Sequence, residues 1–239
     1  MIAIRDVSVS FGGVLALNNL TVNLADSVVG IIGPNGAGKT TLLNVFSGFV
    51  TPACGSIRAF DTDLLAMRPH QRARWGLRRS FQTEQVVDDL SVADNVRAML
   101  DSLPVTSRSE RERQIEKALT YVQLEGKADE LGSALNTYQR RMVELAKTLV
   151  GSPRIVLLDE PGAGLREEEV DALRQTILGI GEQFGAMTLL IDHDVEMIAA
   201  TCISTVVLDF GELLAFGPTA EILKDDRVKA AYLGIEEAE

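Results

Sequence analysis

The chain has 239 residues, of which 46% are hydrophobic and 24% are charged, proportions typical of a globular protein that exclude an intrinsically disordered one. Its formal net charge of −11 at pH 7 disfavours a nucleic-acid-binding protein, because such proteins normally present a basic face. We therefore expect no nucleic-acid partner.

The cysteines and the hydropathy exclude further classes. Cys54 and Cys202 lie far apart and lack metal-type spacing, so we expect a reducing compartment and neither a disulfide framework nor a zinc site. No run reaches about 18 apolar residues, and the N-terminus lacks the regions of a signal peptide. Any role at a membrane is therefore expected to depend on a partner.

The first elements lead into a glycine-rich segment. Residues 2–9 and 20–24 alternate apolar and polar side chains, which predicts half-buried strands. Residues 27–32 form a short apolar run typical of a strand, and residues 40–49 predict a helix. Strand, glycine turn and helix in this order are the context that a phosphate-binding loop requires.

The turn itself matches the pattern G-x-x-x-x-G-K-[ST]. It reads Gly33-Pro34-Asn35-Gly36-Ala37-Gly38-Lys39-Thr40, and Thr41 follows it. The glycines let backbone N–H groups turn toward phosphate oxygens, while the following helix directs its positive dipole end at the same anion. Lys39 can reach the β- and γ-phosphates, and the Thr40 hydroxyl can ligate Mg²⁺. A purely structural glycine turn is disfavoured by the flanking strand and helix.

The middle of the chain changes character. Residues 55–60 and 76–81 predict strands, but no strand pattern appears between about residues 83 and 132. Within that stretch, residues 92–103 and 109–124 predict amphipathic helices separated by Pro104. We interpret this stretch as a helical insert.

A basic run precedes the insert, comprising Arg68, Arg72, Arg74, Arg78 and Arg79. A solvated helix face is the favoured interpretation, and a phosphate-binding patch is the alternative. His70 lies within the run and is interpreted as a surface residue.

Strands and helices alternate again in the last third. Residues 154–158 and 187–191 predict strands on either side of a helix over residues 165–184, and residues 206–209 and 212–216 predict a hairpin around Phe210-Gly211. Alternating β and α elements imply a mostly parallel sheet with helices on both faces.

Three chemically distinctive residues follow strands, where such sheets bind ligands. Asp159 ends the strand at 154–158 and is expected to hold a metal ion or its water shell. Glu160 is the better candidate for polarising an attacking water, and helix capping is the alternative for this pair. His193 follows the strand at 187–191 and can contact a γ-phosphate. Together with Gly33, they are expected to meet at one edge.

Two further candidates rest on weaker signals. Gln82 follows a predicted strand and opens the insert, where a neutral amide can reach the metal or the water and sense movement of the insert. Phe11 can stack on an adenine, although a core aromatic is an equally good interpretation.

These residues together resemble the ABC ATPase family over nearly the whole chain. Gln82 matches the Q-loop, IVLLDEP the Walker B strand, His193 the switch histidine and Phe11 the adenine-stacking aromatic. The resemblance implies an α/β phosphate-loop NTPase fold with an N-terminal antiparallel β part, binding ATP and Mg²⁺. It implies a single domain over 1–239, with a catalytic part at 1–82 and 154–239 and a helical subdomain at 83–153.

Within that family, the chain resembles the branched-chain amino-acid importer ATPases, and the lipopolysaccharide-export ATPases are similar. SFGGVLALNNLTVNL, the RxFQ-type Q-loop and the ending AYLGIEEAE carry this likeness. A lipid or lipopolysaccharide exporter subunit, a non-transport ABC ATPase and a non-hydrolysing regulatory module are the alternatives. The resemblance implies transmembrane permease partners and a peripheral position on the cytoplasmic face of the inner or plasma membrane.

Two segments depart from the family pattern. Where the family has LSGGQ or a variant such as LAYGQ, this chain has Leu135-Asn136-Thr137-Tyr138-Gln139. A tyrosine in place of the second glycine is expected to crowd the approach to a γ-phosphate. The D-loop, usually SAGLD or AAGLN, here carries Arg166 in place of the acid or amide.

The family's dimer gives these departures a meaning. Two subunits sandwich two ATP molecules, each between one subunit's phosphate loop and the other's signature. The departures therefore bear on the partner's site. We expect an asymmetric heterodimer with a second ABC ATPase subunit, and tolerated variation in a homodimer is the alternative.

Overall fold

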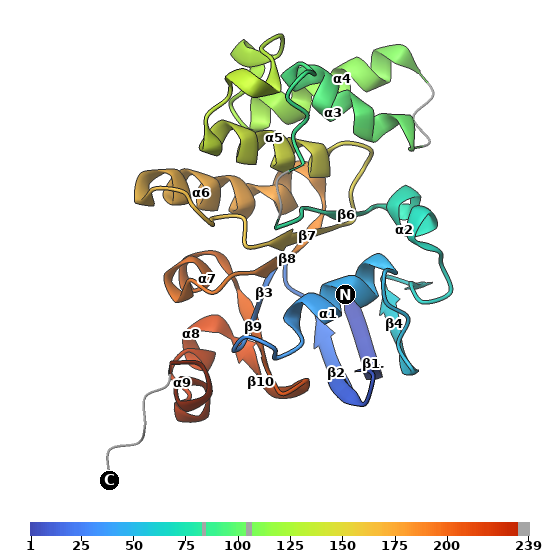
Figure 1. Ribbon diagram of the computed structural model, residues 1–239, viewed down its shortest axis with the longest axis vertical. Coiled ribbons are helices and arrows are strands. Elements are labelled where there is room, and N and C mark those ends of the chain that lie inside the picture. Colours follow the sequence, from blue (N-terminus) through green and yellow to red (C-terminus); the bar gives the residue numbers. More distant parts are fainter. Residues whose placement is uncertain (83–84, 104–106, 234–239) are drawn as a thin grey trace. The chain divides into compact units, whose positions relative to one another are not determined.

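The structure is a computed structural model that describes residues 1–82, 85–103 and 107–233 (Figure 1). Its contacts divide the chain into two compact units, one formed by Met1–Arg72 with Leu189–Glu239 and the other by Ala73–Thr188. The division expected from the family resemblance, at residues 83 and 154, stays a prediction. Pro104 and the last six letters of the ending AYLGIEEAE lie outside the described residues.

The first unit contains an antiparallel sheet. Its strands, in spatial order, are β2 (Val14–Leu24), β1 (Ile2–Phe11), β4 (Cys54–Ala59) and β5 (Thr62–Asp63). Ile2 pairs with Leu24 across β1 and β2, and both side chains are buried. β2 begins earlier than the alternation predicts, because Val14 and Leu15 remain exposed and therefore do not follow the inside–outside pattern.

The same unit contains a parallel strand pair. β3 (Val28–Ile32) pairs in parallel with β9 (Ser204–Asp209), Ile31 facing Val206, and β9 turns into the antiparallel strand β10 (Glu212–Pro218). The helices of this unit are α1 (Lys39–Ser47), α7 (Val195–Thr201), α8 (Thr219–Ile222) and α9 (Asp226–Leu233). Helix α2 (Pro69–Trp75) runs across the boundary between the units. The predicted hairpin around Phe210-Gly211 is confirmed.

The second unit joins two parallel strands to a group of helices. β6 (Leu77–Arg79) pairs in parallel with β7 (Ile155–Asp159). The helices are α3 (Val92–Asp101), α4 (Arg108–Tyr121), α5 (Thr137–Leu149) and α6 (Glu167–Phe184), with short 3-10 turns at Glu125–Lys127 and Gly132–Ala134. α3, α4 and α5 contact one another (Figure 1), which confirms the helical character expected for the insert. β8 (Met187–Ile191) runs across the boundary between the units.

Parallel pairing in both units, with antiparallel pairing in the N-terminal sheet and at β10, confirms the predicted α/β class. Within the described parts of the chain, no helix combines the length and the apolar character that crossing a membrane would need.

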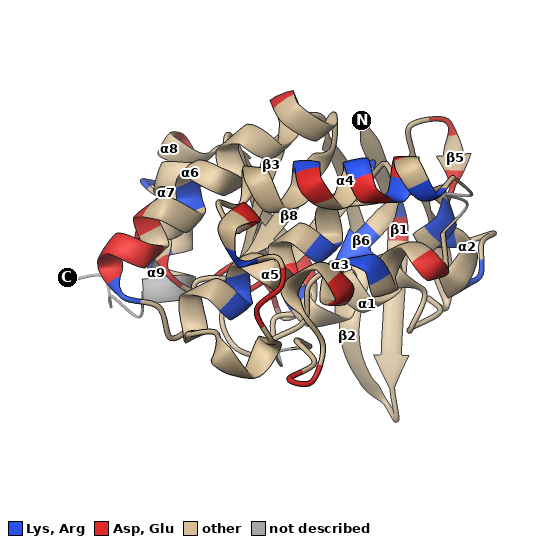
Figure 2. Ribbon diagram, turned by 90° about the horizontal axis from the view of Figure 1, so that it is seen from above, with Lys and Arg blue, Asp and Glu red and all other residues tan. Residues whose placement is uncertain are grey.

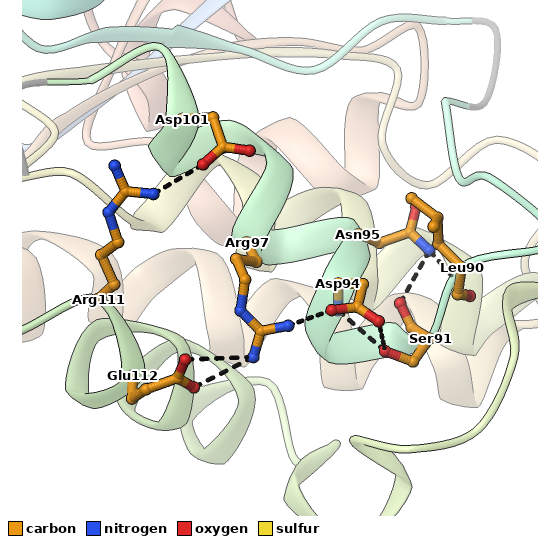
Figure 3. A network of polar contacts seen from close by, with 8 residues as sticks. All are labelled: Leu90, Ser91, Asp94, Asn95, Arg97, Asp101, Arg111 and Glu112. Carbon is orange, nitrogen blue, oxygen red and sulfur yellow. Dashed lines mark hydrogen bonds and ion pairs between the residues drawn. The ribbon is translucent and has the colours of Figure 1, made fainter. Parts of the chain in front are cut away.

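Polar side chains fix the start of the helical region (Figure 3). Asn95 is 1% exposed and its amide donates to the carbonyls of Val87, Leu90 and Ser91, while its Oδ1 accepts from the N–H of Val87 at 2.8 Å. The side-chain amide of Asn95 therefore fixes residues 87–91, the segment that leads into α3.

Exposed ion pairs connect the same helices. Arg97 of α3 donates to both Asp94 and Glu112, and Arg111 of α4 donates to Asp101 at 2.7 Å (Figure 3). Basic and acidic residues alternate along α4 (Figure 2), as expected for a solvated helix face.

The interpretation of the basic run as a solvated face is wrong for three of its arginines. Arg72 is 4% exposed and donates to the carbonyls of Val45 and Phe46 at the end of α1. Arg78 is 2% exposed, and burial lowers its pKa to about 10. Arg79 is also buried, with a side chain 7% exposed. Such burial is tolerated because carbonyl and carboxylate oxygens replace the water that each guanidinium loses. His70 is exposed, as expected.

Candidate functional site

The candidate residues are distributed over both units. The glycine-rich loop lies between β3 and α1 in the first unit. Gly38 adopts φ +103°, and a Cβ placed there would lie 2.5 Å from the carbonyl oxygen of Ala16; at Gly33 the corresponding distance is 2.1 Å, to the oxygen of Leu208. Only glycine fits these two positions, because they combine a left-handed backbone with a close neighbouring chain.

The loop presents donors to an anion. α1 begins at Lys39, no side chain of the described residues caps its N-terminus, and no acidic residue occupies its first turn. The Lys39 ammonium donates to the carbonyls of Gly33 at 2.6 Å and Pro34 at 3.0 Å and so lies across the loop. Backbone N–H groups, a helix N-terminus and an ammonium group are the donors that phosphate oxygens require.

The remaining loop residues differ in exposure. Asn35, Gly36 and Thr40 are exposed, Pro34 and Thr41 are half-buried, and Ala37 is buried. The carbonyl of Ala37 accepts from the N–H of Gly211, so the β9–β10 hairpin supports the loop. Phe11 is 51% exposed at the end of β1, which excludes the core interpretation. Its stacking role stays a prediction.

His193 follows β8 in the same unit, with a side chain that is 69% exposed. The preceding residue, Asp192, is 3% exposed, and burial raises the pKa of its carboxyl. Its Oδ1 accepts from the N–H of Asp194 and lies 3.9 Å from Nδ1 of His193, whereas its Oδ2 finds no hydrogen-bond partner among the described residues. A buried carboxyl thus lies beside an exposed imidazole.

Asp159 ends β7 in the second unit and is 5% exposed. Its Oδ2 accepts from Nη2 of Arg79 at 3.1 Å, and its N–H donates to Oγ of Ser80 at 3.3 Å. Burial lowers the pKa of Arg79, while the carboxylate of Asp159 raises it. The candidate metal carboxylate is therefore held by residues of the neighbouring strand and its continuation.

Glu160 lies directly after β7 and contacts Gln82. Nε2 of Gln82 donates to Oε2 of Glu160 at 3.0 Å. Glu160 adopts φ +49°, which is uncommon for a residue other than glycine and is often found where a side chain is held for function. Two of the predicted residues are thus brought together within one unit.

The chain beyond Gln82 is attached to α5. Residues 83 and 84 lie outside the described part of the chain. The backbone N–H of Gln85 donates to Oε1 of Glu144 at 2.8 Å. The backbone carbonyl of Gln85 accepts from Nζ of Lys147 at 2.6 Å. Glu144 is 4% exposed and also pairs with Arg141. The helix that follows the signature therefore holds the segment that follows Gln82.

The signature segment starts α5. Asn136 and Gln139 form a capping box, in which each side chain accepts from the other's backbone N–H at 2.9 and 3.1 Å. Leu135 is buried, Thr137 is exposed and Tyr138 is half-buried. Burial raises the pKa of the Tyr138 hydroxyl, and the charge of Glu169 adds to this effect. At the start of α6, the backbone N–H and the guanidinium group of Arg166 both donate to the carboxylate of the same Glu169, at 3.0 and 2.7 Å.

Sequence reasoning missed three residues in these surroundings. Arg79 was grouped with a surface run, although its position in a predicted strand directly before Gln82 is a usable signal. Asp192 stands next to His193, yet nothing in the sequence indicates that its carboxyl is buried and that its Oδ2 lacks a hydrogen-bond partner among the described residues. Glu144 occupies a buried position of an amphipathic helix, where an apolar residue would be expected.

The donor chemistry suits a nucleotide with Mg²⁺. The loop supplies N–H groups and an ammonium group for phosphate oxygens. Thr40, Gln82 and Asp159 carry hydroxyl, amide and carboxylate oxygens, the ligand types that Mg²⁺ prefers alongside phosphate and water.

Comparison with known proteins agrees with this chemistry. The family model described as "ABC transporter" matches residues 17–163. The chain is 36% identical to the lipopolysaccharide export system ATP-binding protein LptB of Acidithiobacillus ferridurans, over 98% of this chain and 91% of that protein. It is 33% identical to the high-affinity branched-chain amino acid transport ATP-binding protein BraF of Pseudomonas aeruginosa, over 98% of both chains.

A solved structure extends the likeness to the fold. The crystal structure of the ADP conformation of an ATP-binding cassette of an ABC transporter has a TM-score of 0.86 and 25% identity, covering 98% of each chain. The sequence and fold matches span almost the whole chain, and the family model spans more than half of it. The chain therefore belongs to the ABC transporter family, as an ATPase subunit that binds ATP with Mg²⁺ and hydrolyses it.

Proposed function

We propose that this subunit drives the import of branched-chain amino acids or a related small polar solute. The observation that carries this proposal is the likeness to BraF, which spans 98% of both chains at 33% identity. A lipopolysaccharide or lipid exporter is the second candidate, because the LptB relative is 36% identical over a similar length. In both cases the subunit works with transmembrane permease subunits and lies peripherally at the cytoplasmic face of the membrane.

The residues have distinct proposed roles. In this proposal the loop Gly33–Thr41 binds the phosphates and Phe11 stacks on the adenine. Thr40, Gln82 and Asp159 carry the oxygens that would ligate Mg²⁺. The metal, when bound, neutralises phosphate charge. Glu160 polarises the attacking water, and Gln82, which holds its carboxylate, keeps Glu160 oriented. His193 contacts the γ-phosphate.

Permease subunits are proposed to dock at a pocket in the second unit, here termed the Phe81 pocket. It has a volume of about 230 Å³ and is lined by Arg78, Arg79, Ser80, Phe81, Gln85, Met99, Glu144, Lys147 and Thr148. Phe81 is 38% exposed at this pocket. A helix from a membrane subunit docking here would contact both sides of the segment that carries Gln82. Movement of the helical subdomain, proposed as residues 83–153, would then be transmitted to Glu160.

We also propose that the chain pairs with a different ABC ATPase subunit. The side chain of Asn136 is engaged in its own helix cap, and Tyr138 occupies the position of a family glycine. Both features weaken the signature that this chain offers to a partner's ATP. Its own loop, Glu160 and His193 are retained for a site completed by a partner with an intact signature.

One experiment tests the dimer and another tests the cargo. Glu160→Gln retains ATP and should trap any closed dimer, which light scattering detects. We expect a monomer, and we expect the double variant Asn136→Ser/Tyr138→Gly in the same background to dimerise with ATP. A homodimer of Glu160→Gln alone would contradict the heterodimer proposal. For the cargo, the chain is co-purified with its permeases and reconstituted, and leucine-stimulated ATPase activity is compared with lipopolysaccharide-stimulated activity.

A further inference from the structure

The tip of the β9–β10 hairpin departs from the ordinary chemistry of its turn. Asp209 pairs with Glu212 across the hairpin. Phe210 and Gly211 connect these two residues with φ values of +45° and +81°. Turns with a positive φ at both central residues favour Asn or Asp followed by Gly, because a bulky side chain is strained in the left-handed region. Gly211 follows this rule and Phe210 breaks it.

Burial does not compensate Phe210 for this strain. Its side chain is 86% exposed, the largest exposed fraction of any large apolar residue within residues 1–82, 85–103 and 107–233. Phe60, in the connection between β4 and β5, also has a positive φ of +46° but is half-buried. Apolar burial therefore stabilises Phe60 and contributes little at Phe210. A residue that breaks a local rule without a gain in packing is a candidate for a binding role.

The hairpin tip lies against the phosphate loop. The N–H of Gly211 donates to the carbonyl of Ala37 at 3.1 Å. A Cβ placed on Gly38 would lie 3.6 Å from Cα of Gly211. Because neighbouring Cα atoms are about 3.8 Å apart, the backbone of Phe210 is also held beside the loop.

The same tip lies against the strand that follows Phe11. β2 and β10 contact each other (Figure 1), and the N–H of Asn18 on β2 donates to the carbonyl of Gly211 at 2.8 Å. Phe11 pairs with Val14 at the start of β2. The side chains of Phe11, Val14 and Leu15 are exposed. Exposed apolar side chains therefore belong to both hairpins that adjoin the loop.

We infer that Phe210 is a second aromatic contact for the nucleoside end of the bound nucleotide, in addition to Phe11. Phosphates held by the loop leave the nucleoside to extend over the adjoining surface, where both hairpins present apolar side chains. An aromatic ring binds the flat face of a base by stacking and does not depend on its hydrogen-bonding edge. The inference rests on the proposed role of the loop Gly33–Thr41 in binding the phosphates.

The substitution Phe210→Asn separates binding from folding. Asparagine before glycine is favoured in this turn, so the variant should be at least as stable as the wild type in urea unfolding. Loss of the ring should weaken ADP binding in Mg²⁺ about 5-fold or more, which is the lower end of what base–aromatic stacking contributes. Pyrophosphate offers the loop two phosphates without a nucleoside, so its affinity should not change. Isothermal titration calorimetry measures both ligands, and Phe210→Tyr should bind ADP as the wild type does.

Phe60→Asn is the matched control. Phe60 lies between β4 and β5, at the edge of the antiparallel sheet opposite to β2. Its replacement should lower stability, because a half-buried ring is lost, and should leave ADP affinity unchanged. Equal losses of ADP affinity in Phe60→Asn and Phe210→Asn would assign the effect to folding and overturn the inference. Unchanged ADP affinity in Phe210→Asn would overturn it as well.

The loop has its own test in the same assay. Lys39→Met should weaken the binding of both ADP and pyrophosphate. If both ligands bind this variant as they bind the wild type, the proposed phosphate role of the loop fails, irrespective of Phe210. If Phe210→Asn weakens pyrophosphate binding as much as ADP binding, Phe210 supports the loop and does not contact the nucleoside.

A second measurement reports on the hairpin tip directly. Trp75 is the only tryptophan of the sequence, so Phe210→Trp in a Trp75→Phe background places a single fluorophore at the tip. Stacking of the base should quench its emission when ADP saturates the site, and saturating pyrophosphate should leave the emission unchanged. Equal changes with both ligands, or no change with either, would overturn the inference. In the second case, a protein partner would be the remaining occupant of this exposed surface.

Discussion

Gln82 donates a hydrogen bond to Glu160 across 3.0 Å, between the residue that follows β6 by three positions and the residue directly after β7. The contact joins the start of the helical region to the carboxylate proposed to polarise water. The orientation of the Glu160 carboxylate therefore depends on the position of Gln82.

Gln82→Glu should lower ATP hydrolysis more than Gln82→Met does. A second carboxylate at hydrogen-bond distance repels the carboxylate of Glu160, whereas methionine only removes the hydrogen-bond donor. Steady-state ATPase assays with saturating ATP and Mg²⁺ measure both variants. Equal losses in the two variants would contradict the proposed contact.

Lys39→Met should weaken nucleotide binding more than it weakens the fold. The ammonium group is the side-chain cation of the loop, and a hydrogen bond to a charged group contributes about 1.5–3 kcal/mol. We therefore expect about a 10- to 100-fold loss of ATP affinity, measured with a fluorescent ATP analogue. Lys224→Met, in the segment between α8 and α9, is the control and should bind as the wild type does. Unchanged affinity in Lys39→Met would contradict the proposed loop.

Asp192→Asn should change how stability depends on pH. Burial raises the native pKa of Asp192 above the ordinary value of 3.8. Between the unfolded and native pKa values the native state binds more protons than the unfolded state, so this group lowers stability as pH rises through that window. The stability of Asp192→Asn relative to wild type should therefore increase as the pH rises from the unfolded pKa of 3.8 through the raised native pKa. Urea unfolding of both proteins at each pH measures the difference, and a flat difference would disprove the assignment.

Asn95→Ala should destabilise the helical region. The buried amide satisfies three carbonyls and one N–H, and leaving such groups unpaired costs about 1–3 kcal/mol in free energy of unfolding. Asp101→Ala removes only an exposed ion pair with Arg111 in the same network (Figure 3) and should cost less than about 1 kcal/mol. Chemical denaturation compares the two, and equal losses would contradict this division.

Local chemistry made much of the fold predictable. The glycine loop and its flanking elements follow from backbone requirements that only a few residue types meet, and the predicted strands and helices at 187–191, 92–103 and 109–124 differ little from β8, α3 and α4. The buried arginines were not predictable in this way. Arg72 and Arg79 can be buried because the fold brings acceptor oxygens to them from distant positions in the sequence. From composition alone, every arginine is expected to be exposed to solvent. The same applies to the contact between Gln82 and Glu160, whose residues are 78 positions apart.

The short helix α1 is fixed at the end opposite to its phosphate loop. Arg72 donates to the carbonyls of Val45 and Phe46, at the C-terminal end, where a positive charge also favours the helix dipole. A helix of 9 residues spans about 13 Å, so this arginine lies well away from any phosphate at the loop. A substitution at Arg72 would nevertheless loosen α1, the helix that directly follows the loop and whose N-terminus supplies N–H groups to it. A substitution at Arg72 would be classified as a folding mutation, although its first measurable effect would be faster release of nucleotide.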